Sequence, residues 1–278
     1  MNCRKCQHNN FLNTTHMKKS ILFASSIVAV AMVSSCGNSN KKTAEEATAP
    51  QTEVAPEEDV ITLFDGNTFN GWRGYNRQDV PSAWTIEDGC IKINGSGMGE
   101  AGAKDGGDII FDQKFGNFEL TFDWKVDKGS NSGIFYMVQE VPDKPIYYSA
   151  PEYQILDNQN HPDAKLGVDG NRCSASLYDM IPAKPQNSKP YGEWNSGKIL
   201  VYKGTVVHFQ NDQQVLEYHL WTPEWQAMLD KCKFSKDKNP VAYDLLINCG
   251  GDEKAGYIGL QDHGDNVWYR NIKVKKLD

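Results

Sequence analysis

Two short segments of this chain carry polar side chains that could act together on a sugar. Glu152 and Gln154 lie two residues apart in an extended pattern, so their side chains would share one face of a strand, about 6.5 Å apart. Gln261 and His263 have the same spacing in a second segment. If the two strands pair, these side chains would come within about 5 Å of one another. A carboxylate and an imidazole can exchange protons with a substrate, and amides hydrogen-bond hydroxyls. We therefore predict one concave polar site built from these four residues.

The strand that carries Gln261 would have one buried face and one open face. In Gly256–Gly264, alternation points Ile258 and Leu260 into a core and leaves Gln261 and His263 on the other side. Small residues on that open face would admit a ligand. The alternative interpretation is a strand end with ordinary polar residues.

Asp157 follows the first segment with the opposite strand parity. It would join Glu152 and Gln154 only where the strand ends or bulges, which the next residue, Asn158, makes plausible. In that case Asp157 would be a second carboxylate of the site.

The elements that must position these residues are predominantly strands. Asn117–Asp127 alternates strictly between apolar and polar residues, which indicates a sheet packed on one side. Lys203-Gly204 and Asn211-Asp212 are typical of hairpin turns. Further strands are predicted over Trp84–Ile86, Ile91–Ile93, Asp108–Phe111, Ile134–Gln139, Tyr153–Leu156, Lys198–Tyr202, Thr205–Gln210, Gln213–Tyr218, Tyr257–Gln261 and Val267–Val274.

One short helix is predicted, over Thr222–Lys231, where Thr222 can cap the helix and Pro223 suits its first turn. Asp237–Glu253 is interpreted as an insertion or altered loop. Many short strands with one helix favour an all-β, two-sheet jelly-roll sandwich. The long segment Asn158–Glu193 has little strand pattern, and we expect an ordered loop that folds over the site.

The N-terminus has the pattern of an export signal. A basic start at Met17, an apolar run over Ile21–Val33 and small residues before Cys36 are typical of a secretory signal peptide, and the run is too short for an ordinary membrane span. Residues 17–36 are therefore predicted to be the signal, and Met1–His16 a mis-assigned N-terminal extension. A functional sixteen-residue prefix is the alternative.

The end of this signal resembles that of a bacterial lipoprotein. The resemblance implies cleavage, lipidation of Cys36 and attachment to a membrane through its acyl chains. Gly37–Asp59 has no aromatic residue and cannot bury enough apolar surface to fold, so it is predicted to be a tether. Because no acidic run follows Cys36, we expect an anchor in the cell envelope, at the outer membrane and facing the periplasm.

Composition limits the partners of the remaining region. Val60–Asp278 has the size of one all-β domain. The net charge of −7 argues against nucleic acid, which needs a basic surface. Cys90 lies in an apolar strand pattern and is predicted to be a small core residue.

Several motifs occur in a fixed order along Val60–Asp278. They are Leu63-Phe64-Asp65-Gly66 with Gly71-Trp72, then Asn131-Ser132-Gly133-Ile134, then Glu152-Tyr153-Gln154-Ile155-Leu156-Asp157-Asn158 with His161-Pro162-Asp163-Ala164, then Ser176-Leu177-Tyr178-Asp179 with Gly192-Glu193-Trp194-Asn195, and finally Gly259-Leu260-Gln261-Asp262-His263-Gly264 with Val267-Trp268-Tyr269-Arg270-Asn271-Ile272. In these motifs the region resembles the 3-keto-disaccharide hydrolase family of exported bacterial proteins. The resemblance implies a concanavalin A-like jelly roll that cleaves glycosidic bonds of sugars oxidised at C3.

A ketone at C3 acidifies the proton on C2, so such a bond can break by elimination and be replaced by hydration. Glu152 or His263 would be the base, and Asp157 an alternative proton carrier. Arg270 or a bound divalent cation would stabilise the enolate oxygen. A conventional hydrolase would instead need two carboxylates across the sugar, a role that Glu152 and Asp157 could approximate.

Further residues are predicted to bind rather than react. Trp194 and Tyr178 would stack on the sugar, and the substrate-binding set is completed by Asn131, Gln154, Gln261 and Arg270. Arg270 shares strand parity with Trp268, Ile272 and Val274, so an inward structural pair is the alternative for it. Asp157, His161 and Asp262, beside His263, are candidate metal ligands without a diagnostic spacing.

Two other function classes stay open at this point. A carbohydrate-binding module would need aromatic and amide groups without a base of shifted pKa, and the same fold class serves both purposes. A structural domain of a larger outer-membrane complex is the third alternative.

Overall fold

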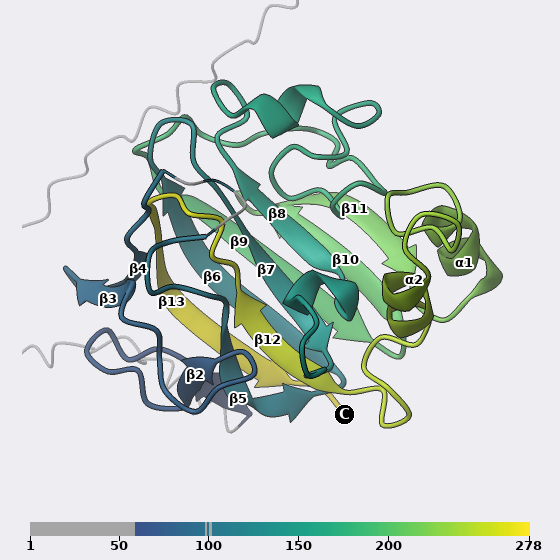
Figure 1. Cartoon of the computed structure of the whole chain (residues 1–278), viewed down its shortest axis with the longest axis horizontal. Helices are drawn as coiled ribbons and strands as arrows, with labels where there is room; N and C mark the ends of the chain where they lie inside the picture. Colours follow the sequence, from purple (N-terminus) through teal and green to yellow (C-terminus); the bar gives the residue numbers. More distant parts are fainter. Residues whose placement is uncertain (1–58, 98, 100–101) are drawn as a thin grey trace, which may run out of the picture. The chain divides into compact units, whose positions relative to one another are not determined.

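Two antiparallel sheets make up the part of the chain that the computed structural model describes, residues 59–97, 99 and 102–278 (Figure 1). The predicted N-terminal extension, the signal peptide with Cys36 and almost all of the tether lie outside these residues. The larger sheet contains β1 (Val60–Thr62), β3 (Trp84–Glu87), β4 (Cys90–Ile93), β6 (Phe118–Val126), β9 (Asn195–Tyr202), β10 (Thr205–Gln210), β11 (Gln213–His219) and β13 (Val267–Lys276). The smaller contains β2 (Trp72–Gly74), β5 (Ile109–Phe115), β7 (Asn131–Val138), β8 (Glu152–Leu156) and β12 (Gly256–Leu260).

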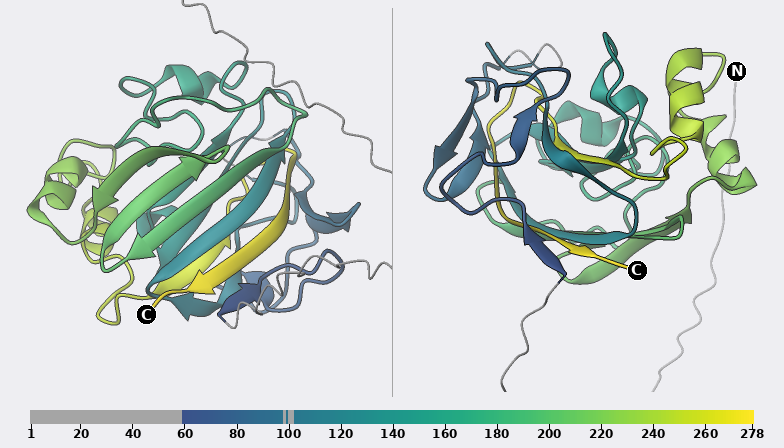
Figure 2. Two further views of the ribbon diagram at one scale, coloured as in Figure 1. Left: turned by 180° about the vertical axis from the view of Figure 1, so that it is seen from behind. Right: turned by 90° about the horizontal axis from the view of Figure 1, so that it is seen from below.

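The two sheets face one another as curved layers (Figure 2). The strand order is β11-β10-β9-β6-β13-β4-β3 in the larger sheet, with β1 beside β13, and β2-β5-β12-β7-β8 in the smaller. The chain crosses between the sheets, for example from β5 to β6, from β8 to β9 and from β12 to β13. Because the two sheets pack face to face, each buries one face against the other. This arrangement confirms the predicted all-β, two-sheet jelly-roll sandwich.

Alternation along the strands builds the core between the layers. In β6 every second residue, from Phe118 to Val126, is buried, as predicted. Lys203-Gly204 and Asn211-Asp212 join β9 to β10 and β10 to β11, and all four of these residues have positive φ, as the common two-residue hairpin turns require. The predicted positions of both hairpins are confirmed.

A β-bulge in β13 changes the predicted orientation of its first half. The register with β6 shifts between Arg270 and Lys273, where Asn271 adopts a φ of 53°. Parity therefore changes across the bulge: Ile272 is buried in the core, whereas Arg270 points outward from the larger sheet. The expectation that Arg270 and Ile272 share a face is wrong for this reason.

Two α-helices occur in the described residues, where the sequence predicted one. Helix α1 (Pro223–Leu229) confirms the first prediction, including the hydrogen bond that the Thr222 side chain accepts from the Trp225 amide. Helix α2 (Pro240–Ile247) lies inside the segment interpreted as a loop. It begins with an Asn239 cap and a proline in its first turn, the same start signals as in α1.

The long segment between β8 and β9 belongs to the described residues over its whole length. It contains the short 3₁₀-helix η3 (Pro162–Lys165) and pairs with the edge of the smaller sheet through a bridge between Tyr153 and Leu177. Cys90 is buried as predicted, and it, Cys173, Cys232 and Cys249 are free thiols. None of the helices in the described region has the length and apolar character to cross a membrane.

Candidate active site

A polar row crosses the outer face of the smaller sheet. Gly133 of β7 pairs with Gln154 of β8, and the backbone amide of Gln261 donates to the Gly133 carbonyl oxygen at 2.9 Å. Asp108 lies just before β5, at the level of Gln261, because Ile109 pairs with Leu260. Strand alternation points the side chains of Asp108, Gln261 and Gln154 away from the core, so three polar groups line up across the sheet, with Gly133 between the two glutamines.

The next row along the same face is apolar apart from one carboxylate. Gly259 pairs with Ile110 on one side and Phe135 on the other, and Phe135 pairs with Glu152. A 3₁₀-helix, η2 (Ile146–Tyr148), lays Ile146 on Gly259; a Cβ at this glycine would lie 2.7 Å from Ile146 Cδ1. Glu152 therefore lies at the boundary between the polar row and a small apolar cluster.

A pocket of about 500 Å³ opens over the polar row. Six of the nine residues predicted to catalyse or bind line it together: Glu152, His263, Gln154, Asn131, Tyr178 and Gln261. Asp262 also lines it, as do Asp108, Tyr147 and Lys233, which the sequence did not single out. Glu152 and His263 thus line one hollow, as expected, but the two strands do not pair as the prediction assumed, because β7 lies between β8 and β12.

Glu152 is held in an unusual environment for a carboxylate. The residue is only 7% exposed, and its side chain forms no hydrogen bond or ion pair with the described residues. Gly133 makes the space, since a Cβ there would lie 2.3 Å from a Glu152 carboxylate oxygen. Burial raises the pKa of Glu152 to about 8, against a smaller opposing effect of Lys233. A carboxyl with this pKa can take and return a proton near neutral pH.

Three amide side chains present unsatisfied acceptors at the same pocket. The oxygens Asn131 Oδ1, Gln154 Oε1 and Gln261 Oε1 are buried without a hydrogen-bond partner among the described residues. An unpaired buried amide oxygen costs free energy, on the order of 1–3 kcal/mol. Because the three residues line one cavity, these oxygens favour a ligand with several hydroxyl donors.

Asp262 organises the glycine-rich wall of the pocket rather than reacting. Its carboxylate accepts hydrogen bonds from the backbone amides of Ala103, Gly107 and Gly264 at 2.7 to 3.0 Å. The Asp262 amide in turn donates to Asp108 Oδ1 at 2.8 Å. Burial raises the pKa of Asp108 to about 7, so a second titratable carboxyl lines the pocket.

The long loop supplies the opposite wall through a chain of ion pairs. Arg172 binds Asp163 at 2.8 Å and Asp179 at 2.7 Å, and Asp179 accepts the Lys233 backbone amide at 2.7 Å. The Tyr178 amide donates to the Glu152 carbonyl oxygen, and its hydroxyl donates to Asp163. The loop therefore fixes Tyr178 and Lys233 against β8.

Three predicted site residues lie elsewhere. Asp157 is buried outside the pocket. Its carboxylate accepts hydrogen bonds from the backbone amides of Gly129 and Asn160 at a turn. Arg270 stacks on the Trp194 ring at 3.9 Å and pairs with Asp123 at 3.2 Å, on the outer face of the larger sheet. Neither Trp194 nor Arg270 lines the pocket, because the bulge in β13 and the start of β9 direct them to that other face.

One group of described residues could gather around a cation. His161, His263 and Asp265 offer ligand atoms that lie within 4.8 Å of one another. However, His161 Nδ1 accepts the Asp163 amide at 3.1 Å, so the other nitrogen of the neutral ring carries a proton. Burial and His263 lower the pKa of His161, which favours the neutral ring. These three residues could hold a metal only if the hydrogen bond from the Asp163 amide to His161 Nδ1 broke. The other two candidate ligands, Asp157 and Asp262, already accept hydrogen bonds from backbone amides.

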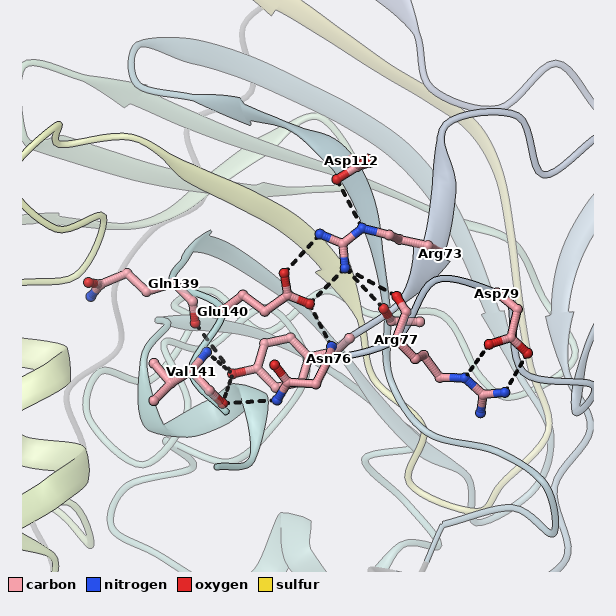
Figure 3. Close-up of polar contacts among 10 residues, drawn as sticks. Arg73, Asn76, Arg77, Asp79, Asp112, Gln139, Glu140 and Val141 are labelled. Carbon is pink, nitrogen blue, oxygen red and sulfur yellow. Dashed lines mark hydrogen bonds and ion pairs between the residues drawn. The ribbon is translucent and has the colours of Figure 1, made fainter. Parts of the chain in front are cut away.

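The far end of the same sheet face is closed by a separate ion cluster (Figure 3). Arg73 binds Glu140 through two nitrogens at 2.7 and 2.8 Å and Asp112 at 2.9 Å. Glu140 also accepts the Asn76 amide. Every charge of this cluster is paired, so we assign it a structural role: it connects β2 to β5 and to the segment that follows β7.

Three pocket residues escaped the sequence for physical reasons. Asp108 precedes its strand, after Gly106-Gly107, and only that glycine pair hinted at a close approach of backbone. Lys233 and Tyr147 lie on connections without a periodic pattern, and tertiary contacts alone bring them to β8. No spacing rule could have placed them.

Comparisons with known proteins agree with this architecture. The model of the 3-keto-alpha-glucoside-1,2-lyase-like domain matches residues 59–275. A Bacteroides thetaiotaomicron protein named 3-keto-disaccharide hydrolase is 68% identical over 227 residues, 78% of each chain. A Parabacteroides distasonis structure that carries the name of a glycosyl hydrolase is 30% identical, with a TM-score of 0.68 over 82% of this chain and 99% of its own. A second structure from that organism, at 24% identity and a TM-score of 0.59, covers 78% of this chain and 99% of its own and shares the fold. The chain belongs to the family of the 3-keto-alpha-glucoside-1,2-lyase-like domain.

Proposed function

We propose that this enzyme hydrolyses the glycosidic bond of sugars that carry a ketone at C3, by elimination followed by hydration. Its membership of the family and the name of its 68% identical relative support the hydrolase activity and the substrate class. The observation that carries the mechanism is Glu152: a buried carboxyl without a protein partner, with a pKa near 8, at the edge of a polar pocket.

The first step is removal of the C2 proton by Glu152. The C–H electrons form a C2=C3 double bond, and the ketone oxygen becomes an enolate. As the carbonyl re-forms, a C1=C2 double bond forms, and the C1–O bond breaks. The leaving oxygen takes a proton from a donor, for which His263 is placed in the same pocket. Water then gives a proton back to His263 as its oxygen adds to C1, and the electrons of the C1=C2 bond move to the ketone oxygen. The Glu152 carboxyl finally returns a proton to C2 as the ketone re-forms, giving net hydrolysis.

The pocket suits the recognition of a small sugar. Its volume of about 500 Å³ lies in the range of small-molecule sites. The amide oxygens of Asn131, Gln154 and Gln261 would accept hydrogen bonds from sugar hydroxyls. A binding module would have no use for a desolvated carboxyl such as Glu152, which favours the enzyme. A conventional hydrolase that uses Glu152 and Asp157 as its two carboxylates is disfavoured, because the Asp157 carboxylate is occupied by hydrogen bonds within a turn.

The deciding experiment compares one glycoside with and without the ketone. We expect the purified protein to release p-nitrophenol from p-nitrophenyl 3-keto-α-glucoside and to leave p-nitrophenyl α-glucoside intact. In deuterated water the sugar product should carry deuterium at C2, because the proton held by the Glu152 carboxyl exchanges with solvent before a proton is returned to C2. Hydrolysis of the ketone substrate without label at C2 would overturn the elimination route while leaving the hydrolase in place.

We further propose that the enzyme works at the cell envelope, attached through lipid on Cys36 and facing the periplasm. The signal-like pattern before this cysteine is the support. Metabolic labelling with a fatty-acid analogue should mark the wild-type protein and not Cys36→Ser, and equal labelling of both would reject the anchor.

A further inference from the structure

Lys233 brings a fixed positive charge to the pocket. It follows helix α1, and its backbone amide donates to Asp179, which Arg172 holds by an ion pair at 2.7 Å. The residue lines the pocket together with Glu152. Its position is therefore set by the same network that orders the long loop.

The ammonium of Lys233 lies over three aromatic rings. The distances from Nζ to the ring centroids are 4.3 Å for Tyr178, 5.0 Å for Phe234 and 5.6 Å for Tyr147. Aromatic faces attract a cation within about 6 Å and can orient it without neutralising it. No carboxylate of the described residues lies within ion-pair distance of this nitrogen. The charge is thus held in place but left uncompensated by an ion pair.

We propose that Lys233 is a catalytic residue that binds the C3 oxygen of the substrate and stabilises the enolate. The inference rests on the proposed elimination, since it assigns the group that receives the charge formed there. When Glu152 removes the C2 proton, one full negative charge moves to the ketone oxygen. An ammonium oriented beforehand stabilises that charge more than the neutral ketone, which lowers the barrier. Arg270, predicted for this role, lies on the other sheet.

A purely indirect role for Lys233 makes a different prediction. Its charge favours the ionised form of Glu152, so its loss would raise the pKa of Glu152. In that case a higher pH would restore the full rate. A group that contacts the enolate would instead lower the rate at every pH, including the plateau where Glu152 is ionised.

The experiment isolates proton removal from bond cleavage. The probe is 1,5-anhydro-3-keto-glucitol, which has the ketone and the C2 proton but no leaving group at C1. Deuterium uptake at C2 is followed by NMR from pH 6 to 10 with wild type, Lys233→Met and Lys233→Arg. We expect the plateau rate of Lys233→Met to fall more than 100-fold and Lys233→Arg to recover at least tenfold of that loss. Lys198→Met is the matched control, because Lys198 lies 4.2 Å from the Phe209 ring away from the pocket.

The outcomes separate the two proposals. Without exchange by the wild type, elimination itself fails. With wild-type exchange and a Lys233→Met variant that reaches the same plateau at higher pH, elimination stands and the role of Lys233 as an enolate-binding group is rejected. Thermal melting of each variant is measured alongside; if Lys233→Met is unfolded, the decision passes to Lys233→Gln under the same criteria.

Discussion

At the scale of single residues, the chemistry depends on a carboxyl that the fold keeps from water. Glu152 pairs with Phe135 in an apolar row and extends over Gly133, so no protein donor reaches its oxygens. Desolvation, with a smaller effect of the Asp108 and Asp163 charges, then makes a side chain that is usually a weak base into one matched to neutral pH. A hydrogen bond or ion pair to Glu152 would have lowered the pKa and weakened the base.

The buried carboxyl should also make stability depend on pH. Its pKa is about 8 in the folded protein and 4.5 in the ordinary state, so the folded state retains a proton that the unfolded state loses between these values. Stability from this group is complete below pH 4.5 and is lost as the pH rises through about 8. We expect Glu152→Gln to lose more than tenfold in turnover. In urea unfolding, the free energy of unfolding of Glu152→Gln relative to that of wild type should increase from pH 5 to 8, by a few kcal/mol.

The wild-type protein provides the reference in each unfolding series. An advantage of Glu152→Gln that stays constant from pH 5 to 8 would show that the carboxyl is not desolvated. Asp108 also titrates in this range, and its charge raises the pKa of Glu152, so the same comparison is repeated in an Asp108→Asn background to separate the two carboxyls.

The sequence identified residues where strand parity decides their direction, and missed those that tertiary packing decides. Glu152, Gln154 and Gln261 follow from period-two alternation along β8 and β12, which lie on either side of β7. The direction of Arg270 depends on a one-residue bulge at Asn271, a position without glycine and hence without an obvious signal. Lys233 comes from a connection whose path follows an ion-pair network.

At the scale of elements, strand pairing and glycine spacing create the pocket. β7 lies between β12 and β8 and contributes Gly133 in the polar row, where any other residue would fill the place of the Glu152 side chain. This gives a physical reason for glycine in the Asn131-Ser132-Gly133 motif. Both hairpins, α1 and the strands other than the three-residue β1 and β2 could be predicted from the sequence. Helix α2 was not, because its eight residues lack a clear apolar stripe and lie in a segment rich in turn-forming residues.

Gly133→Ala should therefore damage the site without breaking the sheet. The backbone at Gly133 does not have a positive φ, so alanine can adopt it, but its Cβ would lie 2.3 Å from Glu152 Oε1. We expect at least a tenfold loss of kcat/KM on the ketone substrate with a cooperative thermal transition retained. In a double-mutant cycle, Gly133→Ala should cost almost nothing in a Glu152→Gln background, since both changes remove the same base. Additive losses would mean that the glycine acts through another residue.

At the scale of the whole sandwich, the outer faces of the two sheets have different roles. The outer face of the smaller sheet carries the pocket, whereas the outer face of the larger sheet carries a stack of rings and cations. Lys125 lies 4.6 Å from the Trp268 ring and 5.1 Å from the Trp194 ring, and Arg270 covers Trp194. These contacts join β6, β13 and the start of β9, so they stabilise the sheet that backs the site.

Arg270→Met tests whether the outer face of the larger sheet contributes to stability and not to the reaction. The change removes a cation–aromatic contact at 3.9 Å and an ion pair with Asp123 at a partly exposed position, where such contacts contribute about 1 kcal/mol. For a domain of this size, that corresponds to a fall in Tm of about 2–4 °C. Turnover of the ketone substrate below that transition should stay within twofold of wild type, because no atom of Arg270 reaches the pocket. A large loss of turnover at unchanged Tm would place Arg270 back in the reaction and contradict the separation of the two faces.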